Sequence, residues 1–111
     1  MQGEEQIQTR TKVKPLGELL EYQDSSIVSR VLLKNNGGTV TLFAFDQGEG
    51  LSEHTTPFEA LVFVVDGEAK LEIAGEVYSV SSGETITLPA NVPHAVRATA
   101  RFKMLLTMIR A

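Results

Sequence analysis

The sequence contains two histidines, His54 and His94, and their imidazoles are the groups best suited to chemistry. An imidazole can ligate a metal ion, exchange a proton near neutral pH or hydrogen-bond a bound molecule. Cysteine is absent, which excludes a thiol nucleophile, a disulfide framework and a zinc site or iron–sulfur cluster ligated by cysteine. Gly37-Gly38 is not followed by the lysine and helix of a phosphate loop, and no Gly-x-Ser-x-Gly elbow occurs. The available chemistry therefore centres on the two imidazoles.

Each histidine follows a turn glycine at a fixed distance. The first segment reads Gly48-Glu-Gly-Leu-Ser-Glu-His54-Thr-Thr56-Pro57-Phe-Glu-Ala60-Leu-Val-Phe-Val-Val-Asp-Gly67. The second reads Gly83-Glu-Thr-Ile-Thr-Leu-Pro89-Ala-Asn91-Val-Pro93-His94. These segments resemble the two motifs of the cupins. The first cupin motif has a Gly, five residues, His-x-His, three or four residues, Glu, six residues and Gly. The second has a Gly, five residues and Pro-x-Gly-x-x-His.

The resemblance extends over roughly residues 26 to 109 and is to small, single-domain cupins of the RmlC-like type. It implies a double-sheet jelly roll that encloses a pocket. In metal-bearing cupins the first motif supplies His, His and Glu as ligands, and the second supplies the last His. His54 matches the first ligand position and His94 the last.

The other two ligand positions are changed in this sequence. Thr56 stands at the second His position and Ala60 at the Glu position. Glu59 is one residue early, so in a regular strand its side chain faces the other way, unless a bulge at Pro57-Phe58 restores it. Two imidazoles without a carboxylate hold a metal weakly. We therefore expect no tightly bound cofactor, and at most a weakly bound divalent ion (Zn, Ni, Fe or Mn).

Three functions are compatible with these residues. The first is a cupin barrel that binds a small molecule in its interior near His54 and His94, without a tightly held metal and with no assignable reaction. Its ligand-binding residues would also include Thr56, Phe43, Phe45 and Met104, although the aromatic and methionine side chains are explained equally well as core. The second is a metal-dependent enzyme, of dioxygenase or isomerase type, using both histidines and a third donor. The third is a sensing or structural protein that acts through its dimer surface.

The rest of the sequence predicts the strands that must position these side chains. The chain has the length of one domain, and short apolar stretches separated by turn residues are typical of an antiparallel sandwich or barrel. Asn35-Asn36-Gly37-Gly38 is a hairpin signal, and Asp66-Gly67 is a turn dipeptide. We expect an N-terminal arm over 1–25, with at most one short helix near Leu16 to Tyr22, and a cupin barrel over 26–111. The fold class is thus all-β, an antiparallel double-stranded β-helix. The expected strands are Ile27–Leu33, Thr39–Phe45, Ala60–Val65, Glu68–Ile73, Glu76–Val80, Thr85–Leu88, His94–Thr99 and Phe102–Ile109.

Charge and hydrophobic pattern predict the environment and the partners. The net charge is −4, and the only local basic cluster consists of Arg97, Arg101 and Lys103. We expect these three side chains to be solvated strand residues, so nucleic acid is not an expected partner. No segment is apolar over a membrane-spanning length and no secretory leader is seen, which predicts a cytoplasmic protein without a membrane partner. Two strands are apolar on both faces. Their outer positions, expected to be covered by the arm or by a second subunit in a homodimer, are Leu61, Phe63, Val65, Leu105 and Ile109.

Overall fold

The computed structural model describes residues 12–110, and within them the chain is all-β, as the sequence predicts. A single 3-10 turn, Leu16–Glu18, is the only helical segment among these residues, and no helix there is long and apolar enough to cross a membrane. Residues 1–11, the first part of the predicted arm, lie outside the described part. The strands are β1 (Ile27–Asn35), β2 (Gly38–Phe45), β3 (Gly50–His54), β4 (Glu59–Asp66), β5 (Glu68–Ile73), β6 (Glu76–Ser81), β7 (Thr85–Leu88), β8 (His94–Arg97) and β9 (Phe102–Ile109).

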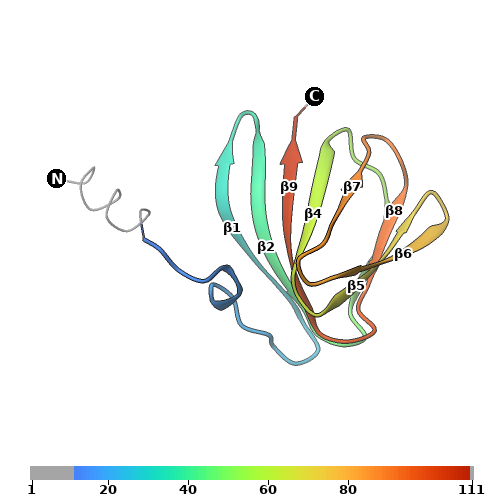
Figure 1. Cartoon of the computed structure of the whole chain (residues 1–111). Coiled ribbons are helices and arrows are strands. Elements are labelled where there is room, and N and C mark those ends of the chain that lie inside the picture. Colours follow the sequence, from blue (N-terminus) through green and yellow to red (C-terminus); the bar gives the residue numbers. More distant parts are fainter. Residues whose placement is uncertain (1–11, 111) are drawn as a thin grey trace.

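The strands form two antiparallel sheets that face each other as a jelly roll (Figure 1). One sheet has five strands in the order β1-β2-β9-β4-β7, and the other has four in the order β3-β8-β5-β6. The last strand, β9, therefore lies in the middle of the larger sheet, between two strands that precede it by many residues. Both sheets direct alternate side chains into the space between them, where the core forms.

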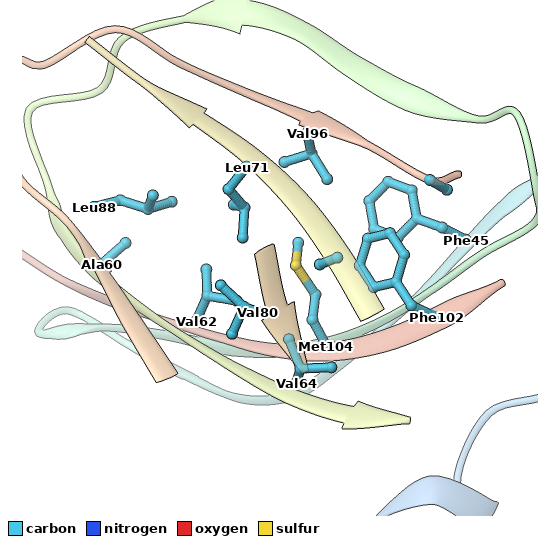
Figure 2. Packing of buried hydrophobic residues seen from close by; sticks show 12 residues of the cluster. Phe45, Ala60, Val62, Val64, Leu71, Val80, Leu88, Val96, Phe102 and Met104 are labelled. Carbon is cyan, nitrogen blue, oxygen red and sulfur yellow. The ribbon is translucent and has the colours of Figure 1, made fainter. Parts of the chain in front are cut away.

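The core follows the alternation that the sequence predicts. Val62 and Val64 of β4, Leu71 of β5 and Met104 of β9 turn inward and are almost completely buried (Figure 2). Phe45 and Phe102 stack with their ring centroids 4.6 Å apart and with no exposed surface. Burying such side chains stabilises the fold by roughly 1.5–3 kcal/mol each, so these rings are among its main stabilising groups.

Turn residues end the strands where the sequence predicts. Between β1 and β2, the Asn35 side chain accepts a hydrogen bond of 2.7 Å from the Gly37 N–H. Between β4 and β5, Gly67 has a φ of 76°, and a Cβ there would collide with the carbonyl oxygen of Arg101. Only glycine combines this left-handed backbone with so close an approach. The first turn fixes the register of β1 and β2, and the second carries the chain from the larger sheet to the smaller one.

Residues 15–25, which we call the strap, cross the outer face of the larger sheet. The Lys103 ammonium donates a hydrogen bond of 2.6 Å to the Gly17 carbonyl and lies 4.8 Å from the centroid of the Tyr22 ring. The Tyr22 hydroxyl donates to Asp66 at 2.6 Å, and burial together with this carboxylate raises the pKa of Tyr22. Lys103 is only 9% exposed, so the expectation that it is a solvated strand residue is wrong. Its amine is instead the anchor of the strap.

A second group of contacts holds the end of the strap. Arg101 donates from Nε to Asp46 and from Nη2 to Asp24, both at 2.7 Å. Asp46 also accepts the Ser25 N–H at 2.6 Å, and Arg101, Ser25 and Gln47 together lower the pKa of Asp46 to about 2. The strap covers only part of the outer face. Leu61 and Ile109 remain 43% and 59% exposed, whereas Phe63, Val65 and Leu105 are half-buried.

Candidate functional site

A β-bulge brings the two histidines together. His54 of β3 and His94 of β8 are register partners, and so are Leu51 and Val96, with a register shift between these two pairs. Three steps along β3 thus correspond to two steps along β8, so one extra residue lies at Ser52-Glu53. Without the extra residue, the side chains of Leu51 and His54 would face opposite sides of the sheet, because side chains alternate along a regular strand. The bulge lets both face the side of Val96 and His94.

The two imidazoles touch each other at the end of the barrel. Their ring centroids are 4.4 Å apart and the rings meet edge to face, at 68°. His94 is 7% exposed, whereas His54 is exposed. One ring therefore belongs to the barrel interior and the other to its rim.

Backbone carbonyls fix which nitrogen of each ring carries a proton. Nδ1 of His54 lies 2.8 Å from the Ser52 carbonyl oxygen, and Nδ1 of His94 lies 3.2 Å from that of Val92. A carbonyl oxygen only accepts hydrogen bonds, so each Nδ1 must be the donor. In a neutral ring, Nε2 then has a free lone pair. No side chain or backbone group within residues 12–110 hydrogen-bonds to either Nε2.

Burial keeps His94 neutral. Desolvation lowers its pKa, the neighbouring His54 lowers it further, and the Val92 carbonyl opposes these effects only in part. A lowered pKa means that the uncharged imidazole predominates at neutral pH. The interior ring thus presents a hydrogen-bond acceptor, which can equally be a metal ligand.

The loops that carry the histidines are tied to each other. Asn91 has a φ of 64°, and its backbone N–H donates a hydrogen bond of 2.7 Å to the Thr56 carbonyl. Asparagine tolerates this left-handed conformation better than most residues. The position corresponds to the glycine of the second cupin motif, which was the available sequence signal for a positive φ. Asn91 therefore joins the β7–β8 loop, which precedes His94, to the β3–β4 loop, which follows His54, a role that the sequence reasoning missed.

The structure does not place a third strong ligand beside the histidines. Ala60 pairs with Met108 and Leu88 and faces the core, so its neighbour Glu59 faces outward, and no bulge at Pro57-Phe58 reverses this. The Thr56 hydroxyl interacts with the backbone of Phe58 at 3.4 Å. Within residues 12–110, no group of three or more His, Cys, Asp or Glu side chains could hold a metal ion. These residues do not fit a tight metal site of the usual three or four donors.

The other predicted ligand contacts lie deeper in the barrel. Phe45 and Met104 are 0% and 2% exposed, and Phe43 is partly buried against the same core, with its ring centroid 6.0 Å from that of Phe45. They are packed core residues, so contact with a ligand would need rearrangement, and their role in binding stays a prediction.

Two surface hollows of the described chain lie away from the histidines. A hollow of about 550 Å³ lies over β3, β8, β5 and β6, and one of about 310 Å³ lies at the β1–β2 hairpin beside β9. Neither is lined by His54 or His94. Of the two rings, His54 is the one that a molecule can reach from outside, because it is exposed whereas His94 is buried.

Comparison with known proteins agrees with this architecture. A conserved protein of unknown function from Streptococcus pyogenes is 33% identical, with a TM-score of 0.87 over 91% of this chain and 89% of that one. A cupin superfamily protein from Desulfitobacterium hafniense is 26% identical, with a TM-score of 0.86 over 91% and 93%. A cupin 2 conserved barrel domain protein from Leptotrichia buccalis is 44% identical, with a TM-score of 0.83 over 86% of this chain and 46% of that one.

One curated relative has a stated activity. A 5-nitrosalicylic acid 1,2-dioxygenase from a Bradyrhizobium species is 44% identical over 52 residues, which are 47% of this chain. The matched part spans only 25% of the dioxygenase. The model of the cupin domain matches residues 41–109, which is more than half of the chain and includes both histidine motifs. This chain is therefore a member of the cupin domain family.

Proposed function

We propose that this cupin binds a small molecule at the open end of its barrel, through Nε2 of His54 and His94, without a tightly held metal. The observation that carries the proposal is the pair of Nδ1–carbonyl contacts, at 2.8 and 3.2 Å, which leave both Nε2 lone pairs available. Residues 12–110 place no carboxylate beside them, which supports a neutral organic ligand over a metal ion.

The same contacts favour one class of ligand. A ring that donates from Nδ1 accepts hydrogen bonds at a free Nε2, so the matching molecule carries a donor such as an alcohol or phenol hydroxyl. Around them the interior is apolar, with Leu88 and Val96 in the same core, which favours a ligand with an apolar body. A hydroxyl-bearing aromatic or aliphatic compound meets both requirements.

A matched pair of compounds tests this proposal. Phenol and anisole have similar apolar bodies, but only phenol donates a hydrogen bond. We expect phenol to shift the side-chain ¹⁵N resonances of both histidines in a saturable way, and anisole to do so much more weakly. His94→Gln should reduce phenol binding about fivefold to tenfold, since a neutral hydrogen bond contributes roughly 1 kcal/mol. Equal binding of phenol and anisole would contradict the proposal.

The second candidate is a metal-dependent enzyme, and the similarity to the dioxygenase favours it. In this case Nε2 of His54 and His94 would hold a divalent ion, and the chain would need a third donor that residues 12–110 do not place there. Metal analysis of protein dialysed against a mild chelator distinguishes the two candidates. Near-stoichiometric metal would favour the enzyme, whereas a trace amount removed by the chelator would favour the metal-free binder.

A further inference from the structure

The larger hollow, of about 550 Å³, lies on the outer face of the four-stranded sheet, away from the histidines. Leu71 of β5 and Val96 of β8 point into the core, so the residues that alternate with them point outward. These outward residues, Lys70, Glu72, Ala95 and Arg97, all line the hollow. A hollow of this volume is in the range of small-molecule sites.

Two positive charges face each other across the floor of this hollow. Lys70 and Arg97 are direct register partners on neighbouring strands, an arrangement in which like charges repel. Lys70 is compensated, because its ammonium lies 3.1 Å from Glu68 and hydrogen-bonds to Ser79. Arg97 is exposed, and it forms no ion pair or side-chain hydrogen bond with any residue from 12 to 110. An uncompensated guanidinium beside a second cation is suited to bind an anion.

In the next row of the sheet, the acidic Glu72 of β5 lies between two apolar side chains, Ala95 of β8 and Val77 of β6. Ala95 pairs with Glu72, and Glu72 pairs in turn with Val77, which is 65% exposed. Glu53, in the bulge of β3, lines the same hollow. Ala95 and Val77 therefore offer apolar surface one row away from the cations, while the two carboxylates disfavour further negative charge there.

We propose that this hollow binds a small organic monoanion. Its carboxylate pairs with the guanidinium of Arg97, next to Lys70, and its apolar body lies over Ala95, the neighbour of Arg97 on the outer face of β8. Binding relieves the repulsion between the two cations. Glu72, the register partner of Ala95, disfavours molecules that carry a second anionic group. The site is separate from the histidine pair, which lies on the inner face of the same sheet.

Benzoate is a suitable probe, with neutral benzamide and dianionic terephthalate as comparisons. We expect benzoate to shift the backbone amide resonances of Ala95 and Arg97 in a saturable way, and to bind more tightly than either comparison compound. Arg97→Gln should weaken benzoate binding about tenfold. Lys34→Gln is the matched control, because it removes the same charge from β1 in the other sheet and should leave the affinity within about twofold.

Two further variants make the test selective. Glu72→Gln should strengthen benzoate binding and reduce the discrimination against terephthalate. His94→Gln should leave benzoate binding unchanged, which separates this site from the one proposed at the barrel end. The proposal is overturned if benzamide binds as well as benzoate, if Arg97→Gln and Lys34→Gln have equal effects, or if no saturable shifts occur at millimolar benzoate.

Discussion

Rebuilding the missing ligand set by Thr56→His with Ala60→Glu tests the placement of the first cupin motif. Ala60 is 6% exposed and lies between Met108 and Leu88 in the core. A glutamate there places a carboxylate in apolar surroundings with no partner, which costs about 2–4 kcal/mol when no metal is bound. We therefore expect the double variant to be less stable than the wild type in the presence of a chelator.

Added metal should reverse this loss. If Glu at position 60 and His at position 56 join His54 and His94 around one ion, metal at a hundred times its dissociation constant stabilises the fold by about 2.7 kcal/mol. For a domain of this size, that corresponds to a rise in Tm of about 10–20 °C. Thermal denaturation with Ni²⁺ or Zn²⁺, and with a chelator, measures both effects.

The neighbouring position provides a matched control. Leu61 is 43% exposed and lies on the opposite face of β4 from Ala60. Thr56→His with Leu61→Glu adds the same groups, yet it should cost little stability without metal and gain no more from metal than Thr56→His alone. If the two double variants respond alike to metal, the register that turns Ala60 inward is wrong.

Three further predictions concern the stability and assembly of the barrel. The contacts of Asp46 lower its pKa from 3.8 to about 2, so they stabilise the fold above pH 3.8 and are lost as the pH falls through 2. Urea denaturation should show this loss in the wild type and not in Asp46→Asn. Phe102→Ala removes a fully buried ring and should cost about 3–5 kcal/mol, measured in the same way. We also expect a homodimer through the exposed outer face of the larger sheet, so Leu61→Glu with Ile109→Glu should give monomers on sedimentation, whereas a monomeric wild type at micromolar concentration would contradict it.

The positions of most strands along the chain could be predicted from local signals. Alternating apolar residues and turn dipeptides mark the strands almost as they occur, since strand period and turn conformation depend on neighbouring residues. The resemblance to cupins predicted that His54 and His94 lie close together. By residue parity alone, however, Leu51 and His54 face opposite ways, and only the bulge at Ser52-Glu53 corrects this. Bulges depend on the register of strands that are distant in sequence, so local pattern does not reveal them.

Contacts between charged side chains of distant segments could not be predicted from the local sequence either. Arg97, Arg101 and Lys103 are close in sequence, yet the structure gives them three different environments. Lys103 is buried beneath the strap, Arg101 bridges two aspartates, and Arg97 faces a hollow on the other sheet. The opposition of Lys70 and Arg97 exists only because β5 pairs with β8. Such environments are set by tertiary pairing, which composition and spacing do not specify.

The central place of β9 determines the order in which the molecule can assemble. β2 and β4 do not pair with each other, because β9 lies between them and joins both. Until residues 102–109 have left the ribosome, the larger sheet can exist only as two separate pieces, the β1–β2 hairpin and the β4–β7 pair. The apolar inner faces of these pieces stay uncovered during synthesis, a state in which chains are prone to aggregate. Closure then needs pairing across long sequence separations, so we expect folding on the millisecond-to-second scale of all-β domains.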